Sequence, residues 1–305
     1  MAKKIQPKKK AAARKAPAAP KKTEREGLSL PTLPKEVEDH ILYYSFLIYG
    51  REKIGKTTLA ASFPNAIFFS TEPGIKGLAV FSFNEEGGGI TEWRIFKEGV
   101  RLLCEIGPKK FKAVVVDTVD RLYDLCLDHV CKERGIPYPG ETASGENDYG
   151  KSWKAVKDEF AGEILKLSRA GFGLVFISHA KEVTTRTRSG EKFDRIYPTM
   201  SNQARSMVEA FVDFMFYAEY VKDMKGQERR ILVCRGDELI FAGARPTPSG
   251  EDFPRFLELK RKGGFDVIDG AFRGEEKGIE PSEILPSRNT AETTKAFLRK
   301  AKKGE

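Results

Sequence analysis

The chain has 305 residues, 40% of them hydrophobic, so it is long enough to bury one substantial core with appendages. Its formal net charge is +9, but residues 1–22 carry nine basic residues and no acid, and the rest has 44 basic and 44 acidic residues. The basic pI is therefore no evidence for a basic face on the folded part. The cysteines and histidines lack metal-ligand spacing, and no apolar run approaches ~18 residues, which argues against a zinc site and a membrane span.

The predicted organisation is one large domain between two basic ends. Residues 1–26 are predicted to be a disordered basic tail, because a segment rich in Lys, Ala and Pro cannot bury apolar surface. This tail either binds phosphate backbones without sequence preference or serves as a solubilising linker. The domain is expected over residues 27–272. Residues 273–305 are predicted to be a linker and a C-terminal basic helix over residues 290–303.

A phosphate-binding loop follows the first predicted strand. Residues 43–49 form an apolar run that predicts a strand, and residues 58–62 predict the start of a helix. In a glycine loop at such a junction, backbone N–H groups face phosphates. Lys56 is expected to reach the β and γ phosphates of a nucleotide, and Thr57 to ligate Mg²⁺. The predicted nucleotide-binding residues are Gly50, Arg51, Glu52, Lys53, Ile54, Gly55, Lys56, Thr57 and Thr58.

The rest of the domain alternates short apolar runs with amphipathic stretches. This alternation predicts an α/β fold whose mainly parallel sheet is covered by helices on both faces. From about residue 212 the pattern changes to short runs separated by turn signals, which predicts an antiparallel C-terminal extension. The predicted strands are residues 66–70, 113–116, 173–177, 214–217, 230–234 and 238–241, and the predicted helices are residues 97–106, 120–134 and 152–170.

Three polar side chains directly follow predicted strands, where ligands bind in open parallel sheets. Asp117 is predicted to hold Mg²⁺, although an Asp at this position is also a common helix N-cap. Glu72 is placed to activate a water that attacks the γ phosphate, or it is a solvated residue of an ordinary Glu-Pro-Gly turn. His179 is predicted to contact the γ phosphate, with a packed or capping histidine as the alternative.

The order of these motifs resembles the RecA-type ATPase core, and most of all the compact phage-encoded proteins of the Sak type, which are single-strand annealing ATPases. The resemblance covers roughly residues 41–259. It implies a P-loop NTPase that binds ATP and Mg²⁺, with Glu72 as catalytic base and His179 as γ-phosphate sensor, where RecA has a glutamine. It also implies a basic residue, Arg245, near the nucleotide of the same or a neighbouring subunit; Arg205 and Lys181 are alternatives.

The resemblance further implies two loops that face DNA, at residues 135–150 and 183–202. The second combines cations with aromatic residues, which suits single-stranded DNA because backbone charge and base stacking act together. Further copies of the chain in a ring or filament and a single-strand binding protein are the other expected partners, with no membrane partner. A phage protein of this kind is expected in the host bacterial cytoplasm. The expected DNA contacts are the N-terminal tail, Arg186, Arg188, Lys192 and Arg195.

The leading interpretation is an ATPase that converts ATP and water to ADP and phosphate, binds single-stranded DNA, and assists phage recombination or single-strand annealing. One alternative is a P-loop small-molecule or nucleotide kinase, which would need an acceptor pocket and an arginine-bearing lid. Another is a nucleotide-gated DNA-binding module with little hydrolysis. The sequence leaves both alternatives open.

Overall fold

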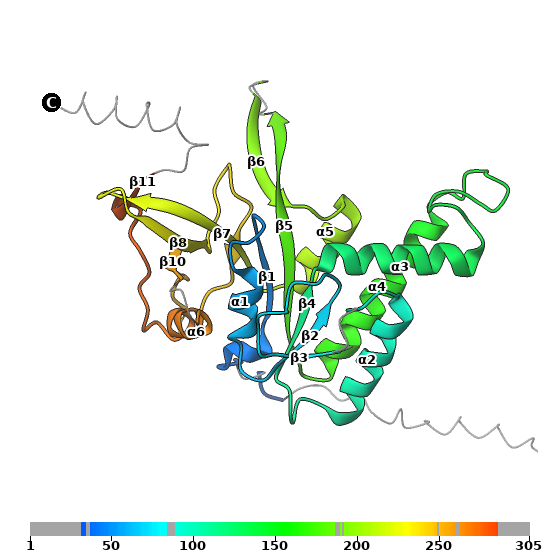
Figure 1. Cartoon of the computed structure of the whole chain (residues 1–305), viewed down its shortest axis with the longest axis horizontal. Coiled ribbons are helices and arrows are strands. Elements are labelled where there is room, and N and C mark those ends of the chain that lie inside the picture. The colour runs from blue at the N-terminus through cyan, green and yellow to red at the C-terminus, as the bar shows by residue number, and fades with distance from the viewer. Residues whose placement is uncertain are drawn as a thin grey trace, which may run out of the picture. The chain divides into compact units, whose positions relative to one another are not determined.

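The computed structural model describes residues 32–34, 37–83, 89–186, 190, 192–248, 250–259 and 263–285. The chain divides into two compact units, residues 1–37 and residues 38–305, and the second contains the helices and strands named below (Figure 1). The predicted tail over residues 1–26 and the predicted helix over residues 290–303 lie outside the described residues.

A parallel sheet forms the centre of the second unit. Its central strands run in the order β3-β2-β4-β5-β1-β7, and each adjacent pair is parallel. Strand β5 lies between the strand that leads into the phosphate loop and the strand that ends at Asp117. The strands are β1 (Ser45–Gly50), β2 (Ala66–Ser70), β3 (Phe81–Ser82), β4 (Ala113–Asp117), β5 (Gly173–Arg186) and β7 (Phe214–Asp223).

Helices cover both faces of this sheet because its strands are apolar on both sides. In β1, Phe46 and Ile48 pack into one hydrophobic cluster and Leu47 into another, as the two-residue period of a strand requires. Helices α1 (Lys56–Ala61) and α6 (Phe265–Phe272) contribute to the first cluster. The second is completed by α2 (Trp93–Ile106), α3 (Val119–Arg134), α4 (Lys151–Arg169) and α5 (Asn202–Phe211). The predicted α/β fold is confirmed.

The antiparallel extension is also present, beyond β7. Strands β8 (Glu228–Val233) and β10 (Phe256–Glu258) continue the sheet, and the short strands β9 (Gly243–Ala244) and β11 (Ile284–Leu285) pair with β7. The strand predicted for residues 238–241 is wrong. Asp237 accepts hydrogen bonds from the backbone N–H groups of Leu239 and Ile240, and this local turn leaves only an isolated bridge between Ile240 and Ile196.

Most of the loop predicted for residues 183–202 instead belongs to a β-hairpin. Strand β5 continues past the sheet, and β6 (Lys192–Pro198) pairs antiparallel with it from Ala180–Pro198 to Arg186–Lys192. Figure 1 shows this hairpin extending from the carboxyl end of β5. We call β6 and the paired part of β5 the β5–β6 hairpin. Two 3-10 helices, Ile41–Tyr43 and Pro281–Glu283, complete the regular elements of the described residues.

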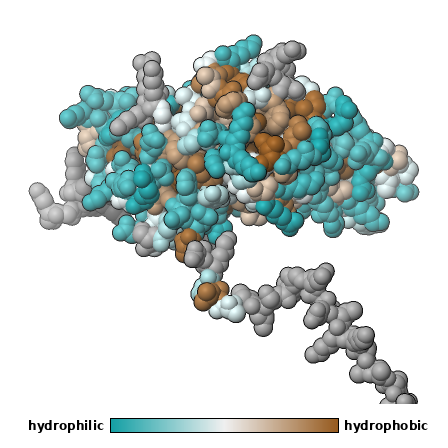
Figure 2. Space-filling model, turned by 90° about the horizontal axis from the view of Figure 1, so that it is seen from below, coloured by the Kyte–Doolittle hydropathy of each residue, from teal (hydrophilic) through white to brown (hydrophobic). Residues whose placement is uncertain are grey.

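Some apolar side chains stay on the surface. Figure 2 shows one face of the molecule on which hydrophobic residues gather between hydrophilic flanks. In edge strand β3, Phe81 is 48% exposed and its ring contacts that of Phe111, while Lys110 Nζ lies 5.2 and 5.0 Å from the two ring centroids. The cation therefore covers part of the apolar edge. No helix in the described ranges has both the length and the apolarity needed to cross a membrane.

Candidate nucleotide-binding site

The phosphate loop joins β1 to α1 at the carboxyl edge of the sheet. Strand β1 ends at Gly50 and α1 begins at Lys56. Gly55 has a φ of 95°, a conformation that glycine adopts without strain. A Cβ atom at Gly55 would also lie 2.3 Å from Nη1 of Arg230, so a larger residue would have to displace the end of that side chain.

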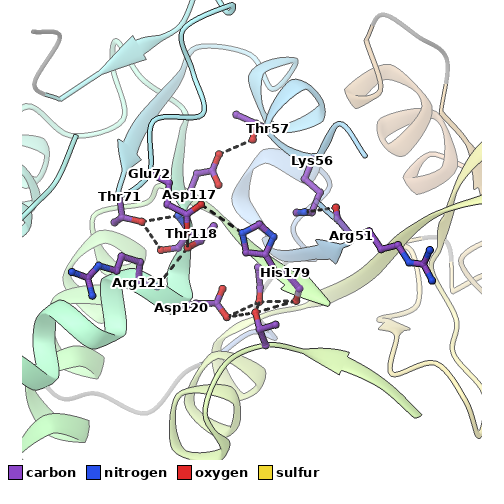
Figure 3. A network of polar contacts seen from close by, with 12 residues as sticks. Arg51, Lys56, Thr57, Thr71, Glu72, Asp117, Thr118, Asp120, Arg121 and His179 are labelled. Atoms are coloured by element: carbon purple, nitrogen blue, oxygen red, sulfur yellow. Dashed lines mark hydrogen bonds and ion pairs between the residues drawn. The ribbon is translucent and has the colours of Figure 1, made fainter. Parts of the chain in front are cut away.

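Lys56 is held inside the loop by the loop's own backbone. Its side chain is buried, and Nζ donates hydrogen bonds to the carbonyl oxygens of Gly50 (2.9 Å) and Arg51 (2.8 Å), as Figure 3 shows for Arg51. Burial lowers the pKa of Lys56, and nearby acids, foremost Asp117, oppose that shift. The ammonium group is thus fixed among strong acceptors in a poorly solvated place, where an anionic ligand would gain most from it.

Thr57 and Asp117 form the pair predicted to bind Mg²⁺. Thr57 Oγ1 donates a 2.7 Å hydrogen bond to Asp117 Oδ2 (Figure 3). Burial raises the pKa of Asp117, and the hydrogen bond from Thr57 opposes the shift. Within the described ranges, no group of three or more His, Cys, Asp or Glu side chains is arranged to hold a metal. The pair fits Mg²⁺, which favours oxygen ligands and is often held by one or two carboxylates together with substrate phosphates.

Glu72 lies between Thr118 and His179. Its Oε1 accepts a 3.0 Å hydrogen bond from Thr118 Oγ1, and its Oε2 is 3.6 Å from His179 Nε2 (Figure 3). Thr71 fixes the end of β2 against β4, because its Oγ1 accepts from Thr118 N at 2.8 Å and donates to Thr118 O at 3.1 Å. The strand register places His179 directly beside Gly50. The structure therefore brings the predicted residues Lys56, Thr57, Glu72, Asp117 and His179 to one site.

Two side chains at this site were missed by the sequence reasoning. Asp120, in the first turn of α3, accepts hydrogen bonds from Ser178 Oγ (3.0 Å) and Thr199 Oγ1 (2.7 Å). Arg230, on β8, donates a 3.4 Å hydrogen bond to the carbonyl oxygen of Ile54 in the phosphate loop. Asp120 has a sequence signal, three residues after Asp117, but Arg230 has none because only the pairing of β7 with β8 brings it to the loop.

Arg245 does not lie at the phosphate loop of its own chain. Its Nε is 2.7 Å from Oδ1 of Asp213, whose Oδ2 accepts a hydrogen bond from the backbone N–H of Ser45. Ser45 is the first residue of β1, whereas the phosphate loop follows the last. The prediction that Arg245 acts at the nucleotide of the same subunit is therefore not supported, because this arginine is paired at the opposite end of β1. A role at a neighbouring subunit stays a prediction.

The alternatives to Arg245 lie at the root of the hairpin. Lys181 Nζ donates to the carbonyl oxygens of Thr199 (3.1 Å) and Met200 (3.2 Å). The guanidinium of Arg205 lies 4.5 Å from the ring centroid of Tyr197, and its Nε is 3.2 Å from Oε1 of Glu209. Both cations thus have structural contacts in this chain.

The cations predicted to bind DNA differ in position. Arg186 and Lys192 face each other at the exposed end of the hairpin. Arg195 instead lies over the rings of Tyr197 and Phe241, at 5.2 and 5.5 Å from their centroids, so its charge is already engaged. Arg188 lies outside the described residues.

Comparison with known proteins places most of this region in one family. A family model described as an AAA domain matches residues 42–246, which is more than half of the chain. The SPbeta prophage-derived uncharacterized protein YorG of Bacillus subtilis (strain 168) is 27% identical over 173 residues, which make up 56% of this chain and 49% of that protein. The chain thus matches about half the length of this curated relative. The family match spans the phosphate loop, Glu72, Asp117 and His179.

Proposed function

The chain belongs to the AAA domain family of P-loop NTPases, and we propose that it is a Mg²⁺-dependent ATPase that binds single-stranded DNA and assists phage recombination or single-strand annealing. One observation carries the ATPase part. A buried lysine in the phosphate loop, a threonine–aspartate pair suited to Mg²⁺ and a glutamate lie together at the carboxyl edge of one parallel sheet. These are the charges and acceptors that phosphoryl transfer to water needs.

The binding half of the reaction belongs to the loop and its neighbours. Lys56 supplies a positive charge for the β and γ phosphates of ATP, with its backbone partners Gly50 and Arg51 setting its position. Thr57 and Asp117 would hold the metal ion, which when bound neutralises charge on the phosphate oxygens. The buried setting of these groups strengthens each electrostatic contact with the substrate.

Glu72 is the candidate general base. It accepts a proton from water as the water oxygen attacks the γ phosphorus and the bond to the ADP oxygen breaks. Thr118 holds one carboxylate oxygen by a hydrogen bond, whereas the other is 3.6 Å from His179 and is the looser of the two. That second oxygen is available to a water molecule with a small change in the position of His179. His179 would then report the presence of the γ phosphate to strand β5.

The DNA-binding part rests on the β5–β6 hairpin. Its exposed end presents Arg186 and Lys192, and Phe193 lies one residue along. Cations track the phosphates of a single strand and aromatic rings stack on bases, which gives binding without sequence preference. The prophage-derived name of the relative in Bacillus subtilis supports a phage context for this activity.

Phosphate release from ATP, measured with and without single-stranded DNA, tests the proposal. We expect Mg²⁺-dependent release that DNA stimulates, and Glu72→Gln should lower the rate by about 10²- to 10⁴-fold while nucleotide binding persists. Glu105→Gln, on the exposed side of α2, is the control and should hydrolyse ATP normally.

Normal turnover by Glu72→Gln would refute its assignment as base. Transfer of phosphate to an organic acceptor would favour a kinase, and DNA affinity that depends on ATP without phosphate release would favour a gated binding module.

A further inference from the structure

One carboxylate joins the catalytic edge of the sheet to the root of the hairpin. Asp120 Oδ1 accepts hydrogen bonds from Ser178 and from Thr199, at 3.0 and 2.7 Å; Figure 3 shows Asp120 below His179. Ser178 directly precedes His179 in β5, and Thr199 directly follows β6. The carboxylate therefore contacts the chain on both sides of the root of the hairpin, in β5 just before the paired part and directly after β6.

The root of the hairpin is itself held together by short contacts. The backbone N–H of Thr199 donates to the carbonyl oxygen of His179 at 2.9 Å, and Lys181 Nζ donates to Thr199 O at 3.1 Å. These bonds hold His179 and Thr199 together, so that the two residues form one unit that moves as a whole. Asp120 adds the link from this unit to α3, whose N-cap residue Thr118 holds Glu72.

Packing alone does not account for an acid at this place. Asp120 Oδ2 is buried and has no hydrogen-bond partner among the described residues, and burial raises the pKa of the carboxyl group, opposed by the hydrogen bonds from Thr199 and Ser178. Burying a carboxylate costs free energy that its two hydroxyl donors only partly offset. The contacts that this acid makes are with Ser178 and Thr199, outside its own helix, and they point to a positioning role.

We propose that Asp120 is a positioning residue that couples the nucleotide site to the β5–β6 hairpin. Asp120 holds Ser178 and Thr199 together against α3. A displacement of His179 therefore also displaces the hairpin root. Nucleotide at Lys56 and Asp117 then tightens the hairpin root, and a ligand on the hairpin resets the distance between His179 and Glu72. The coupling rests on the proposed nucleotide binding, and its test needs no DNA.

Hydrogen exchange of backbone amides in residues 178–186 and 192–200 measures this coupling. The probe is a non-hydrolysable ATP analogue with Mg²⁺. In the wild-type protein the analogue should slow exchange at the hairpin root. Asp120→Ala should still bind the analogue, but the factor by which the analogue slows exchange should be smaller by about fivefold or more. Asp120→Asn should keep most of it, because its amide oxygen accepts from the same two hydroxyl groups.

Two further variants make the test specific. Thr199→Val removes one donor to Asp120 and nothing from α3, and should reproduce the loss even if Asp120→Ala folds poorly. Thr184→Val removes a hydroxyl of the same kind, which donates to Asp194 within the exposed hairpin at 2.7 Å, and should leave the protection unchanged.

The outcomes separate the two proposals. Equal protection in wild type, Asp120→Ala and Thr199→Val, with the analogue bound in all three, would overturn the coupling alone. Wild-type protein that binds the analogue without any change in the hairpin would do the same. Absence of analogue binding in the wild type would overturn the proposed nucleotide function and the coupling with it.

Discussion

Strand β5 takes part in two regions that differ in how they are held. Its first half, through Ser178, is buried between β1 and β4, and Ser178 itself is 0% exposed. Its second half, from Ala180 to Arg186, pairs with β6 and is mostly half-buried or exposed. Burial on both faces fixes the strand ends at the candidate nucleotide site, whereas a strand pair with few buried contacts opens and shifts at low cost. The comparison suggests a rigid nucleotide site connected to an adaptable hairpin.

The largest expected effect is in the rigid region, at the phosphate loop. Lys56→Ala should reduce ATP affinity by roughly 150-fold, or about 3 kcal/mol, because a desolvated charge that faces the substrate is lost. Stability without nucleotide should not fall, since burial lowers the pKa of Lys56 and its charge is costly in the folded state. Titration calorimetry measures the affinity and thermal unfolding the stability.

Lys109→Ala, on the exposed loop after α2, is the matched control for Lys56→Ala and should bind ATP normally. Equal affinity of Lys56→Ala and the wild type would contradict the assignment of the loop. A large loss of stability without nucleotide would show that Lys56 supports the fold rather than the ligand.

The nucleotide site could be predicted from the sequence because its signals are local. The glycine loop, the apolar strand before Asp117 and the turn after Glu72 are each set by a few consecutive residues. The α/β fold follows from the same kind of signal, as continuous apolar runs require cover on both faces. The carboxyl ends of parallel strands then meet at one edge, which brings Glu72, Asp117 and His179 together.

The remaining features depend on contacts between distant segments. Charged residues interrupt the apolar residues of β6 without a regular period, and only its pairing with the extended β5 makes it a strand. Ile240 lies in an apolar run typical of a strand, but the side chain of Asp237 forms a local turn instead. Arg230 reaches Ile54 from 176 positions away, a contact that no sequence spacing indicates.

The second prediction concerns β7, the strand beside β1 in the rigid region. Glu219 on β7 has its pKa raised to about 7 by burial, with Arg51 of the phosphate loop opposing and Asp237 adding to the shift. Between pH ~4.5 and 7 the unfolded state releases this proton more readily than the folded state, so Glu219 destabilises the fold increasingly as pH rises through that window. Glu219→Gln should therefore raise the free energy of unfolding by about 2 kcal/mol at pH 8 and by much less at pH 5.

Urea unfolding at the two pH values measures this difference, with the exposed Glu228→Gln on β8 as the control. A gain of the same size at pH 5 and pH 8 would mean that Glu219 acts through packing rather than through its proton. If the gain follows pH, β7 carries a buried carboxylate beside the phosphate loop once the pH exceeds the pKa of Glu219.

The third prediction asks whether β8 belongs to the nucleotide site. Arg230→Gln removes the cation that contacts Ile54 and lies against Gly55, and should weaken ATP binding by about tenfold, or ~1.4 kcal/mol. Arg229→Gln is the control on the same strand, because Arg229 pairs with Glu258 and Glu283 instead. It should lower stability without changing the affinity. Equal affinities for the two variants would exclude Arg230 from the site.

The smallest expected effect is at the exposed end of the hairpin. Replacing Arg186 and Lys192 together by Ala should weaken single-stranded DNA binding severalfold and flatten its dependence on log salt by about 1.4, since each phosphate contact on a single strand contributes ~0.7 to the slope. Fluorescence anisotropy of a labelled oligonucleotide across salt concentrations measures both quantities. Lys76 and Lys109, both exposed and outside the hairpin, form the control pair. An unchanged slope would place the DNA contacts elsewhere. A reduced slope with unchanged ATP affinity would show that the hairpin contributes charge to DNA independently of the rigid site beneath it.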